Sequence, residues 1–105
     1  DVRAEFEPLA KRIAEALDKE PGPISIIGHT DNVKLKATNR FKSNFDLSVA
    51  RAEAAAEIIK TLIADPARIA VSGKGEDDPA APNDTAEGRT KNRRVDITIP
   101  REETL

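Results

Sequence analysis

The N-terminal stretch of the chain has the apolar spacing of an amphipathic helix. Its apolar residues recur at intervals of three and four positions, with charged residues between them: Phe6, Leu9, Ala10, Ile13, Ala14 and Leu17. Prolines at 21 and 23 end this helix. The β-branched run at 24–28 then predicts a short strand suited to the middle of a sheet.

The remaining pattern predicts one long helix and two more strands. Ser43 is the expected N-cap of the long helix, and Asp46 is well placed near the positive end of its dipole. The expected elements are, in order, a solvated loop over 32–42, an Ala-rich helix over 45–63, a strand over 69–73, a surface loop over 74–84, a turn or short helix over 85–91, and an alternating strand over 95–99.

This order of elements predicts an α/β two-layer sandwich with a small mixed sheet covered by helices on one face. Three strands are few for two helices to cover, so we expect a further strand before Asp1. The 105 residues, none of them Met, are expected to form one domain over 1–105, cut from a longer protein whose targeting or membrane segments lie outside it.

Composition excludes several kinds of chemistry. The chain has no Cys and a single His, which excludes a disulfide scaffold, thiolate catalysis and a Cys- or His-rich metal site. We therefore expect neither a metal nor a cofactor. The apolar runs are far shorter than the roughly 20 residues of a membrane-spanning helix.

One arginine stands among the apolar residues of the long helix. At about 100° per residue, Arg51 falls inside the stripe formed by Leu47, Ile58 and Leu62. A buried guanidinium needs an acceptor, and Asp31, after the first strand, is the expected one. The pair is either a structural ion pair or a split site, in which Asp31 takes a ligand ammonium and Arg51 a ligand carboxylate.

Four motifs, in order, carry a family resemblance: G-H-T-D at 28–31, N-x-x-L-S-x-x-R-A at 44–52, G-x-G-E-x-x-P at 73–79 and N-x-T-x-E-G-R-x-x-N-R-R-V at 83–95. Together they resemble the OmpA-like (OmpA/MotB/Pal) peptidoglycan-binding domain, and the resemblance covers nearly the whole chain. It implies a βαβαβ-type fold that grips the meso-diaminopimelate of the peptidoglycan stem peptide without cutting it.

The resemblance also implies the site residues. Asp31 and Arg51 would hold the amino-acid head of diaminopimelate, with Thr30, Asn44 and Leu47 in the same pocket. Arg93 would approach the pocket from the last loop, while Arg94 is expected to be structural.

The loop after T-D is long, in the form T-D-N-V at 30–33 followed by R-F-x-S-N at 40–44. This form resembles two inner-membrane-anchored subgroups, the flagellar stator protein MotB and the type VI secretion subunit TssL, and the 73–79 loop is more similar to TssL. The resemblance implies a periplasmic domain of an inner-membrane protein that anchors a secretion complex to the cell wall. Its partners would be the stem peptide, other subunits of the complex and a second copy of the chain.

The sequence raises three other functions. The basic run at 89–94 raises nucleic-acid binding, but the net charge is -2 and no aromatic residue lies near the run. Arg89 and Lys91 are instead expected to be solvated or to anchor a loop. Catalysis by His29 with Ser43 or Ser48 lacks any nucleophile motif, so His29 is expected to form a structural hydrogen bond. A protein interaction module, using the 34–42 loop and keeping Asp31 and Arg51 as an internal ion pair, is the remaining alternative.

Overall fold

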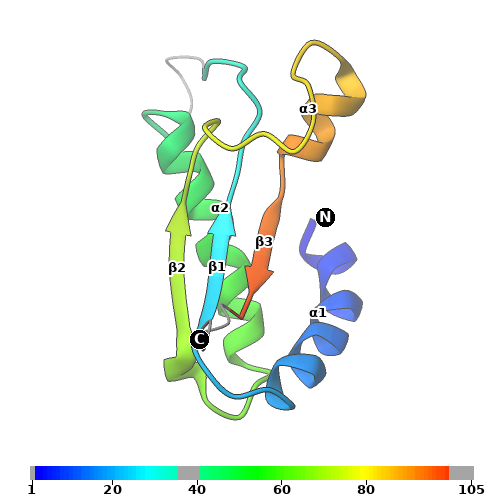
Figure 1. Cartoon of the computed structure of the whole chain (residues 1–105), viewed down its shortest axis with the longest axis vertical. Coiled ribbons are helices and arrows are strands. Elements are labelled where there is room, and N and C mark those ends of the chain that lie inside the picture. The colour runs from blue at the N-terminus through cyan, green and yellow to red at the C-terminus, as the bar shows by residue number, and fades with distance from the viewer. Residues whose placement is uncertain (1, 36–40, 100–105) are drawn as a thin grey trace, which may run out of the picture.

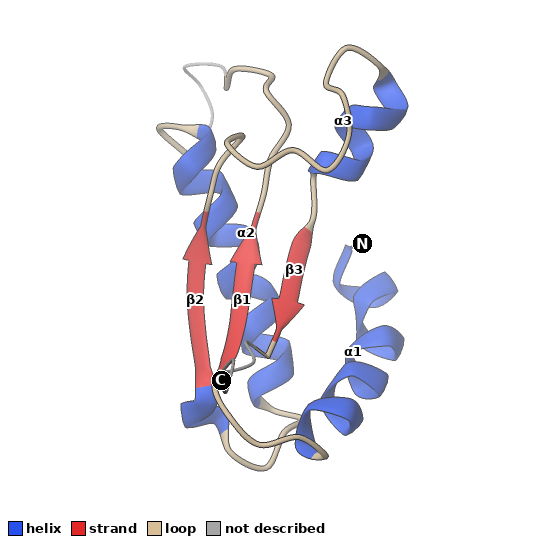
Figure 2. Cartoon of the chain, viewed as in Figure 1, coloured by secondary structure: helices blue, strands red, loops and turns tan. Residues whose placement is uncertain are grey.

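The computed structural model describes residues 2–35 and 41–99, except the side chains of residues 2–7. Its elements are α1 (Val2–Asp18), β1 (Ile24–Gly28), α2 (Asn44–Lys60), the short 3-10 helix η1 (Pro66–Arg68), β2 (Ile69–Gly73), α3 (Ala86–Asn92) and β3 (Val95–Thr98) (Figure 1). The strand order is β2-β1-β3. β1 runs parallel to β2 and antiparallel to β3, so the predicted small mixed sheet is confirmed (Figure 2).

The two faces of the sheet differ in polarity. Ile26 of β1 is fully buried and lies opposite Val71 of β2 and Ile97 of β3, which pack against the same core. On the other face, Ile27 lies opposite Ser72 and Asp96. α2 packs against the apolar face, and α1 packs against α2 (Figure 1). Helices therefore cover one face of the sheet, as the sequence predicted.

Local capping fixes where the helices begin. The Ser43 side chain accepts a 3.1 Å hydrogen bond from the Asp46 amide, which confirms the predicted N-cap of α2. Thr85 caps α3 in the same way, through the Gly88 amide at 3.0 Å. α2 ends at Lys60, three residues before the predicted boundary, and Thr61 forms its C-cap.

The buried face of α2 differs from the predicted one. Its buried residues are mainly small: Ser48, Ala52, Ala55, Ala56 and Ile59. These positions centre about 100° around the helix from the predicted stripe of Leu47, Ile58 and Leu62. The helix rests so close to the sheet that a Cβ added at Gly28 would overlap the Ser48 carbonyl oxygen. Small residues therefore face the sheet, and Arg51 lies at the edge of the buried face, half-buried.

α1 follows its predicted stripe only in part. Ala10, Ala14 and Leu17 are buried, whereas Leu9 is 53% exposed, so its predicted burial is wrong. Ala10, Ala14 and Leu17 belong to the same core cluster as the buried apolar residues of α2, and Leu9 is not part of it. The side chain of Phe6, also in the predicted stripe, lies outside the described residues, as do residues 36–40 of the predicted loop.

A single arginine holds the end of α1. The Arg68 guanidinium donates to three backbone carbonyls, those of Leu17, Glu20 and Gly22. These groups belong to the last turn of α1 and the connection to β1, where carbonyl oxygens have no partner within the helix. Arg68 therefore fixes the direction in which the chain enters β1.

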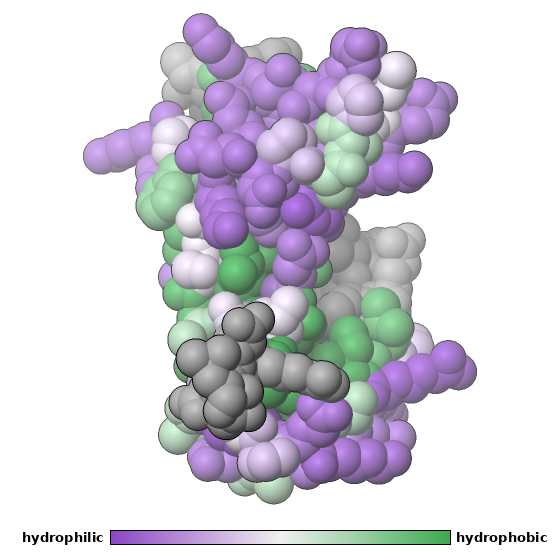
Figure 3. Space-filling view, in the orientation of Figure 1, coloured by the Kyte–Doolittle hydropathy of each residue, from purple (hydrophilic) through white to green (hydrophobic). Residues whose placement is uncertain are grey.

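The connections at the carboxyl ends of β1 and β2 gather with α3 at one end of the molecule (Figure 1). This end is predominantly hydrophilic in the view of Figure 3, whereas apolar residues appear over the sheet below it. None of the helices in the described ranges combines the length and apolarity that a bilayer crossing needs.

Candidate ligand-binding site

Backbone hydrogen bonds fix the segment that follows β1. The His29 amide donates to the Arg94 carbonyl and the Thr30 amide to the Gly75 carbonyl, both at 2.8 Å. The Thr30 hydroxyl donates to the carbonyl oxygen of Asp31 at 2.8 Å. The segment is thus held from both neighbouring loops, and the direction of the Asp31 side chain is set by the sheet.

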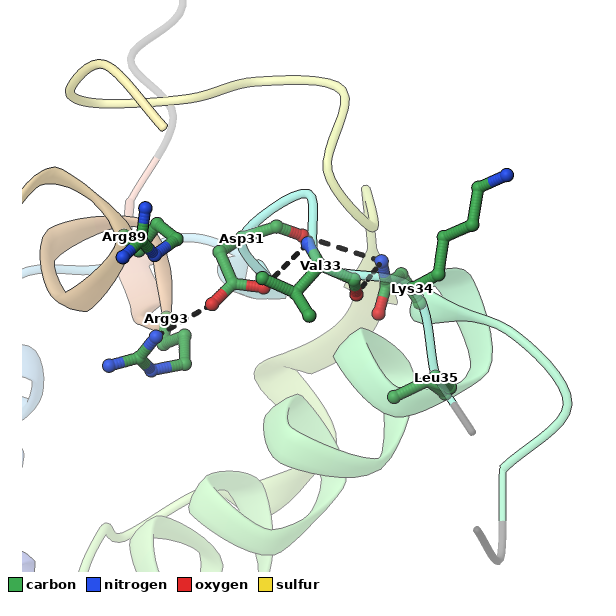
Figure 4. A pocket seen from close by; sticks show the side chains of 7 residues that line it. Asp31, Val33, Lys34, Leu35, Arg89 and Arg93 are labelled. Atoms are coloured by element: carbon green, nitrogen blue, oxygen red, sulfur yellow. Dashed lines mark hydrogen bonds and ion pairs between the residues drawn. The ribbon is translucent and has the colours of Figure 1, made fainter. Parts of the chain in front are cut away.

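The carboxylate of Asp31 has two partners. Its Oδ1 accepts a 3.0 Å hydrogen bond from the Val33 amide, which closes a tight turn. Its Oδ2 accepts a 2.6 Å bond from Nη1 of Arg93 (Figure 4). The Asp31 side chain is only 11% exposed, against 41% for Arg93, so the pair lies at the border between interior and solvent.

Arg51 does not pair with Asp31. Its Nη1 donates instead to the backbone carbonyl of His29 at 3.1 Å. Burial lowers the pKa of Arg51, the charge of Arg93 lowers it further, and Asp31 raises it. Of the two alternatives for Asp31 and Arg51, the structural ion pair is therefore not formed within the described residues, because Arg51 reaches the strand backbone while Arg93 binds the carboxylate. Arg51 nevertheless lies close enough to Asp31 and Arg93 for both charges to shift its pKa.

A pocket of about 490 Å³ opens beside this pair. It is lined by Asp31, Val33, Lys34, Leu35, Asn44, Arg89 and Arg93 (Figure 4). Of the six predicted site residues, Asp31, Asn44 and Arg93 line it. Thr30, Leu47 and Arg51 are outside the lining, Thr30 being 3% exposed with its hydroxyl engaged by the backbone. The pocket therefore brings together one carboxylate and several cations.

Asn44 connects the helix to the pocket rim. Its Nδ2 donates to the carbonyl of Val33 at 3.0 Å and, at 3.4 Å, to that of Asp31. Because Asn44 is the first residue of α2, these bonds join the start of the helix to the turn that presents the carboxylate. Its amide positions the rim as well as lining the pocket.

Sequence reasoning did not include Val33, Lys34, Leu35 and Arg89 in the site. The first three follow directly on T-D at 30–31, and that adjacency was the available signal. Arg89 lies one helical turn before Arg93 on α3, so the two arginines share a face. Its Nη1 donates to the Asn83 carbonyl at 2.9 Å, which agrees with the predicted loop-anchoring role.

His29 belongs to a second polar cluster at the end of β1. It is 1% exposed, and its Nε2 lies 3.1 Å from Oδ2 of Asp96, although neither ring nitrogen has a hydrogen-bond partner of good geometry within the described residues. Burial lowers the pKa of His29 below 6.5, Arg94 lowers it further, and Asp96 and Asp78 oppose this. Burial and Arg94 therefore favour the neutral form of this imidazole.

Arg94 is structural, as predicted. Its Nε donates to Asp96 at 3.1 Å and its Nη2 to the Asp78 carbonyl at 3.0 Å. It therefore points to the β2–α3 connection, whereas its neighbour Arg93 points to Asp31.

Two fully buried polar residues hold the loops that frame the site. The Asn92 amide group accepts from the Ala80 and Ala81 amides and donates to the Ala81 carbonyl and to Asn83. The Ser48 hydroxyl donates to the Phe45 carbonyl at 2.7 Å and accepts from the Gly75 amide at 2.9 Å. The Ser48 hydroxyl is satisfied by backbone groups alone and the Asn92 amide by backbone groups and the Asn83 side chain, as buried polar groups generally are satisfied.

Within residues 2–35 and 41–99, no three His, Asp or Glu side chains come together as a metal ion would need.

A model of the OmpA family matches residues 2–93. This chain belongs to the OmpA family. Among relatives of this OmpA-family chain, Motility protein B of Bacillus subtilis is 45% identical in a 103-position alignment that covers 93% of the chain and 38% of that protein. Outer membrane protein Omp38 of Acinetobacter baumannii is 36% identical in a 101-position alignment that covers 94% of the chain and 27% of that protein.

Solved structures agree with this membership. The C-terminal domain of Helicobacter pylori MotB superposes with a TM-score of 0.83 and 32% identity, over 94% of this chain and 76% of that one. The cell wall anchor of the T6SS, the type VI secretion system, from Pseudomonas aeruginosa gives a TM-score of 0.81 and 44% identity, over 93% and 68%. The OmpA-family chain thus spans well under half of its Bacillus relative but most of these solved domains.

Proposed function

We propose that this chain is a non-catalytic domain that binds peptidoglycan through the meso-diaminopimelate of the stem peptide. The observation that carries the proposal is the pocket in which Asp31 and Arg93 form an ion pair. Arg51 lies outside the lining but near both charges. A carboxylate next to guanidinium groups is complementary to an amino-acid head, whose ammonium pairs with the acid and whose carboxylate pairs with an arginine. Membership of the OmpA family supports this assignment.

The serines also favour binding over catalysis. The hydroxyl of Ser48 is fully buried and engaged at both its donor and acceptor sides, and Ser43 caps α2. A nucleophilic serine needs a hydroxyl free to attack and a base within hydrogen-bond reach. Ser48 offers no such hydroxyl, and the Ser43 oxygen accepts the N-cap hydrogen bond of α2.

In the cell, the proposed role is that of a periplasmic domain that fixes an inner-membrane complex to the wall. The complex we favour is a type VI secretion assembly, on the likeness to the Pseudomonas aeruginosa cell wall anchor at 44% identity. One amino-acid head in an open pocket gives roughly millimolar to micromolar affinity, about -4 to -8 kcal/mol. Firm attachment therefore needs several copies on one polymer, which fits other subunits or a second copy of the chain as partners.

A flagellar stator is the second candidate, favoured by the 45% identity to Motility protein B of Bacillus subtilis. Two chimaeras distinguish the candidates, one with this domain in the Pseudomonas anchor and one with it in the Bacillus protein. Restored secretion-dependent killing supports the first, and restored swimming supports the second. Restoration of neither function, in a chimaera that is stably expressed, contradicts both contexts.

The ligand is tested by titrating the domain with a stem peptide that contains meso-diaminopimelate and with the matched lysine peptide. The expected result is stronger binding of the diaminopimelate peptide and its loss, by about tenfold or more, in Asp31→Ala. Pull-down on purified cell wall is the companion measurement. An Asp31→Ala domain that binds as well as the parent contradicts the proposal, and failure of both peptides leaves the protein interaction module as the explanation.

A further inference from the structure

Asp31 already has a cation in place. Arg93 Nη1 lies 2.6 Å from Oδ2, and the other oxygen, Oδ1, is occupied by the Val33 amide. We propose that Arg93 is an internal counterion of Asp31. When the ligand ammonium binds Asp31, the Arg93 guanidinium moves from Asp31 to the carboxylate of the ligand, and this exchange makes the pocket select amino-acid heads over simple amines. This inference rests on the proposed function and adds a specificity-determining role to one residue of that site.

Arg93 is placed to move. Its side chain is 41% exposed, and its second nitrogen, Nη2, donates only to the exposed hydroxyl of Thr90, one turn earlier on the same helix. Neither bond joins Arg93 to the apolar core. Arg51, by contrast, is half-buried and bonded to the strand backbone through the His29 carbonyl. Of Arg51 and Arg93, Arg93 is therefore the one whose guanidinium can change partner without disturbing the sheet.

The charge of the pocket makes the exchange selective. Among the described residues, its lining includes three cationic side chains, Lys34, Arg89 and Arg93, and one carboxylate, that of Asp31. An amine that displaces Arg93 adds a positive charge and leaves a guanidinium without its partner, which is unfavourable. An amino-acid head brings its own carboxylate, so the displaced guanidinium gains a new bidentate partner. The pocket therefore binds an ammonium group more tightly when the ligand carries a carboxylate next to it.

A matched series of small molecules tests this directly. Meso-diaminopimelate has two amino-acid heads, lysine has one head and one plain amine, and 1,5-diaminopentane has the same two amines with no carboxylate. Nuclear magnetic resonance titration of the domain with each gives three dissociation constants. We expect binding in the order diaminopimelate, lysine, diaminopentane.

The decisive variant is Arg93→Gln. We expect diaminopentane to bind about two- to fivefold more tightly and diaminopimelate about two- to fivefold more weakly, so that their ratio falls by about four- to 25-fold. Lys91→Gln is the control, because it removes an exposed cation of α3 that does not line the pocket and leaves the Asp31 contact intact. Its ratio should stay within about twofold of the parent. Arg93→Lys keeps the charge and should recover part of the preference.

The outcomes separate the two proposals. If diaminopimelate binds the parent but the ratio is unchanged in Arg93→Gln, the counterion exchange is wrong and the peptidoglycan function stands. An equal fall in the ratio with Lys91→Gln also overturns it, because the ratio then responds to net charge alone. If the parent binds neither diaminopimelate nor the stem peptide, the proposed function fails and the exchange fails with it. Thermal unfolding of each variant confirms that it is folded.

Discussion

Asp31 Oδ2 and Arg93 Nη1 lie 2.6 Å apart, although 62 positions separate the two residues in the chain. Asp31 follows the central strand, and Arg93 is the C-cap of α3. Their contact joins the two parts of the molecule that frame the pocket. The pocket is consequently complete only when the sheet and α3 are both in place, and variants that loosen either part affect ligand binding as well as stability.

Arg51→Lys is expected to weaken binding of the diaminopimelate peptide by about tenfold, or ~1.4 kcal/mol. A lysine ammonium cannot keep the bond to the His29 carbonyl and also present a planar fork to a ligand carboxylate. Isothermal titration of the variant beside Lys60→Gln, an exposed change at the end of the same helix, measures the effect. Equal affinities of Arg51→Lys and the parent would exclude Arg51 from the ligand contact.

Gly28→Ala is expected to destabilise the domain by about 3 kcal/mol or more, because the new methyl group would overlap the Ser48 carbonyl and push α2 away from the sheet. Urea unfolding followed by circular dichroism gives the free energy. Ser72→Ala, at an exposed position of the neighbouring strand, is the control and should change it by less than about 0.5 kcal/mol. A Gly28→Ala domain as stable as this control contradicts the close approach of α2.

Asn92→Ala is expected to lower the free energy of unfolding by about 2–4 kcal/mol. The change removes four hydrogen bonds and leaves the amides of Ala80 and Ala81 without their partner. Lys91→Ala, at the exposed neighbouring position, should have little effect in the same urea experiment. Hydrogen exchange at the two alanine amides provides an independent check, and unchanged protection there would argue against the role of Asn92.

The domain is expected to lose stability as the pH falls from 7.5 toward 5. The pKa of His29 in the folded state lies below the 6.5 expected when the chain is unfolded, mainly because the imidazole is buried. Between these two values the unfolded chain binds a proton that the folded domain does not, so folding becomes less favourable as the pH drops. The slope attributable to one such group is at most about 1.4 kcal/mol per pH unit.

His29→Gln removes this contribution, so the difference in unfolding free energy between parent and variant should shrink as the pH falls. Urea unfolding at closely spaced pH values measures both curves. Two curves that stay parallel from pH 7.5 to 5 would show that His29 does not titrate in the way its surroundings imply.

Much of the fold could be predicted because its signals are local. Ser43 has the side chain of an N-cap and so marks the start of α2, and prolines separate the first helix from the central strand. Alternation and β-branching mark the three strands. Each of these signals lies within a few residues of the element that it starts, ends or forms, so the sequence alone is enough to predict that element.

The orientation of α2 could not be predicted in the same way. Periodicity assigns the interior to large apolar residues such as Leu47 and Ile58, but the sheet takes the small side of the helix. That choice depends on Gly28 and Gly73, which let the helix backbone approach and which are distant from it in sequence. A glycine at the end of a strand, matched with serine and alanine on a helix, was the signal available.

The site was partly predictable for a related reason. Asp31, Asn44 and Arg93 were named from motifs, and all three line the pocket. Which arginine pairs with Asp31 depends on how far α3 reaches over the end of β1, a tertiary property without a sequence period. The roles of Thr30, Leu47 and Arg51 toward a ligand stay predictions.

The central position of β1 also has a mechanical consequence. β1 ends shortly before Asp31 and is paired with β2 over five residues and with β3 over four. A tension applied between α1 and a ligand held at Asp31 runs along the axis of this strand, which is hydrogen-bonded on both sides. The hydrogen bonds on its two sides are then sheared together instead of being peeled apart one by one. Resistance to extraction is therefore governed by a rupture rate under force, which a domain of modest equilibrium stability can keep low.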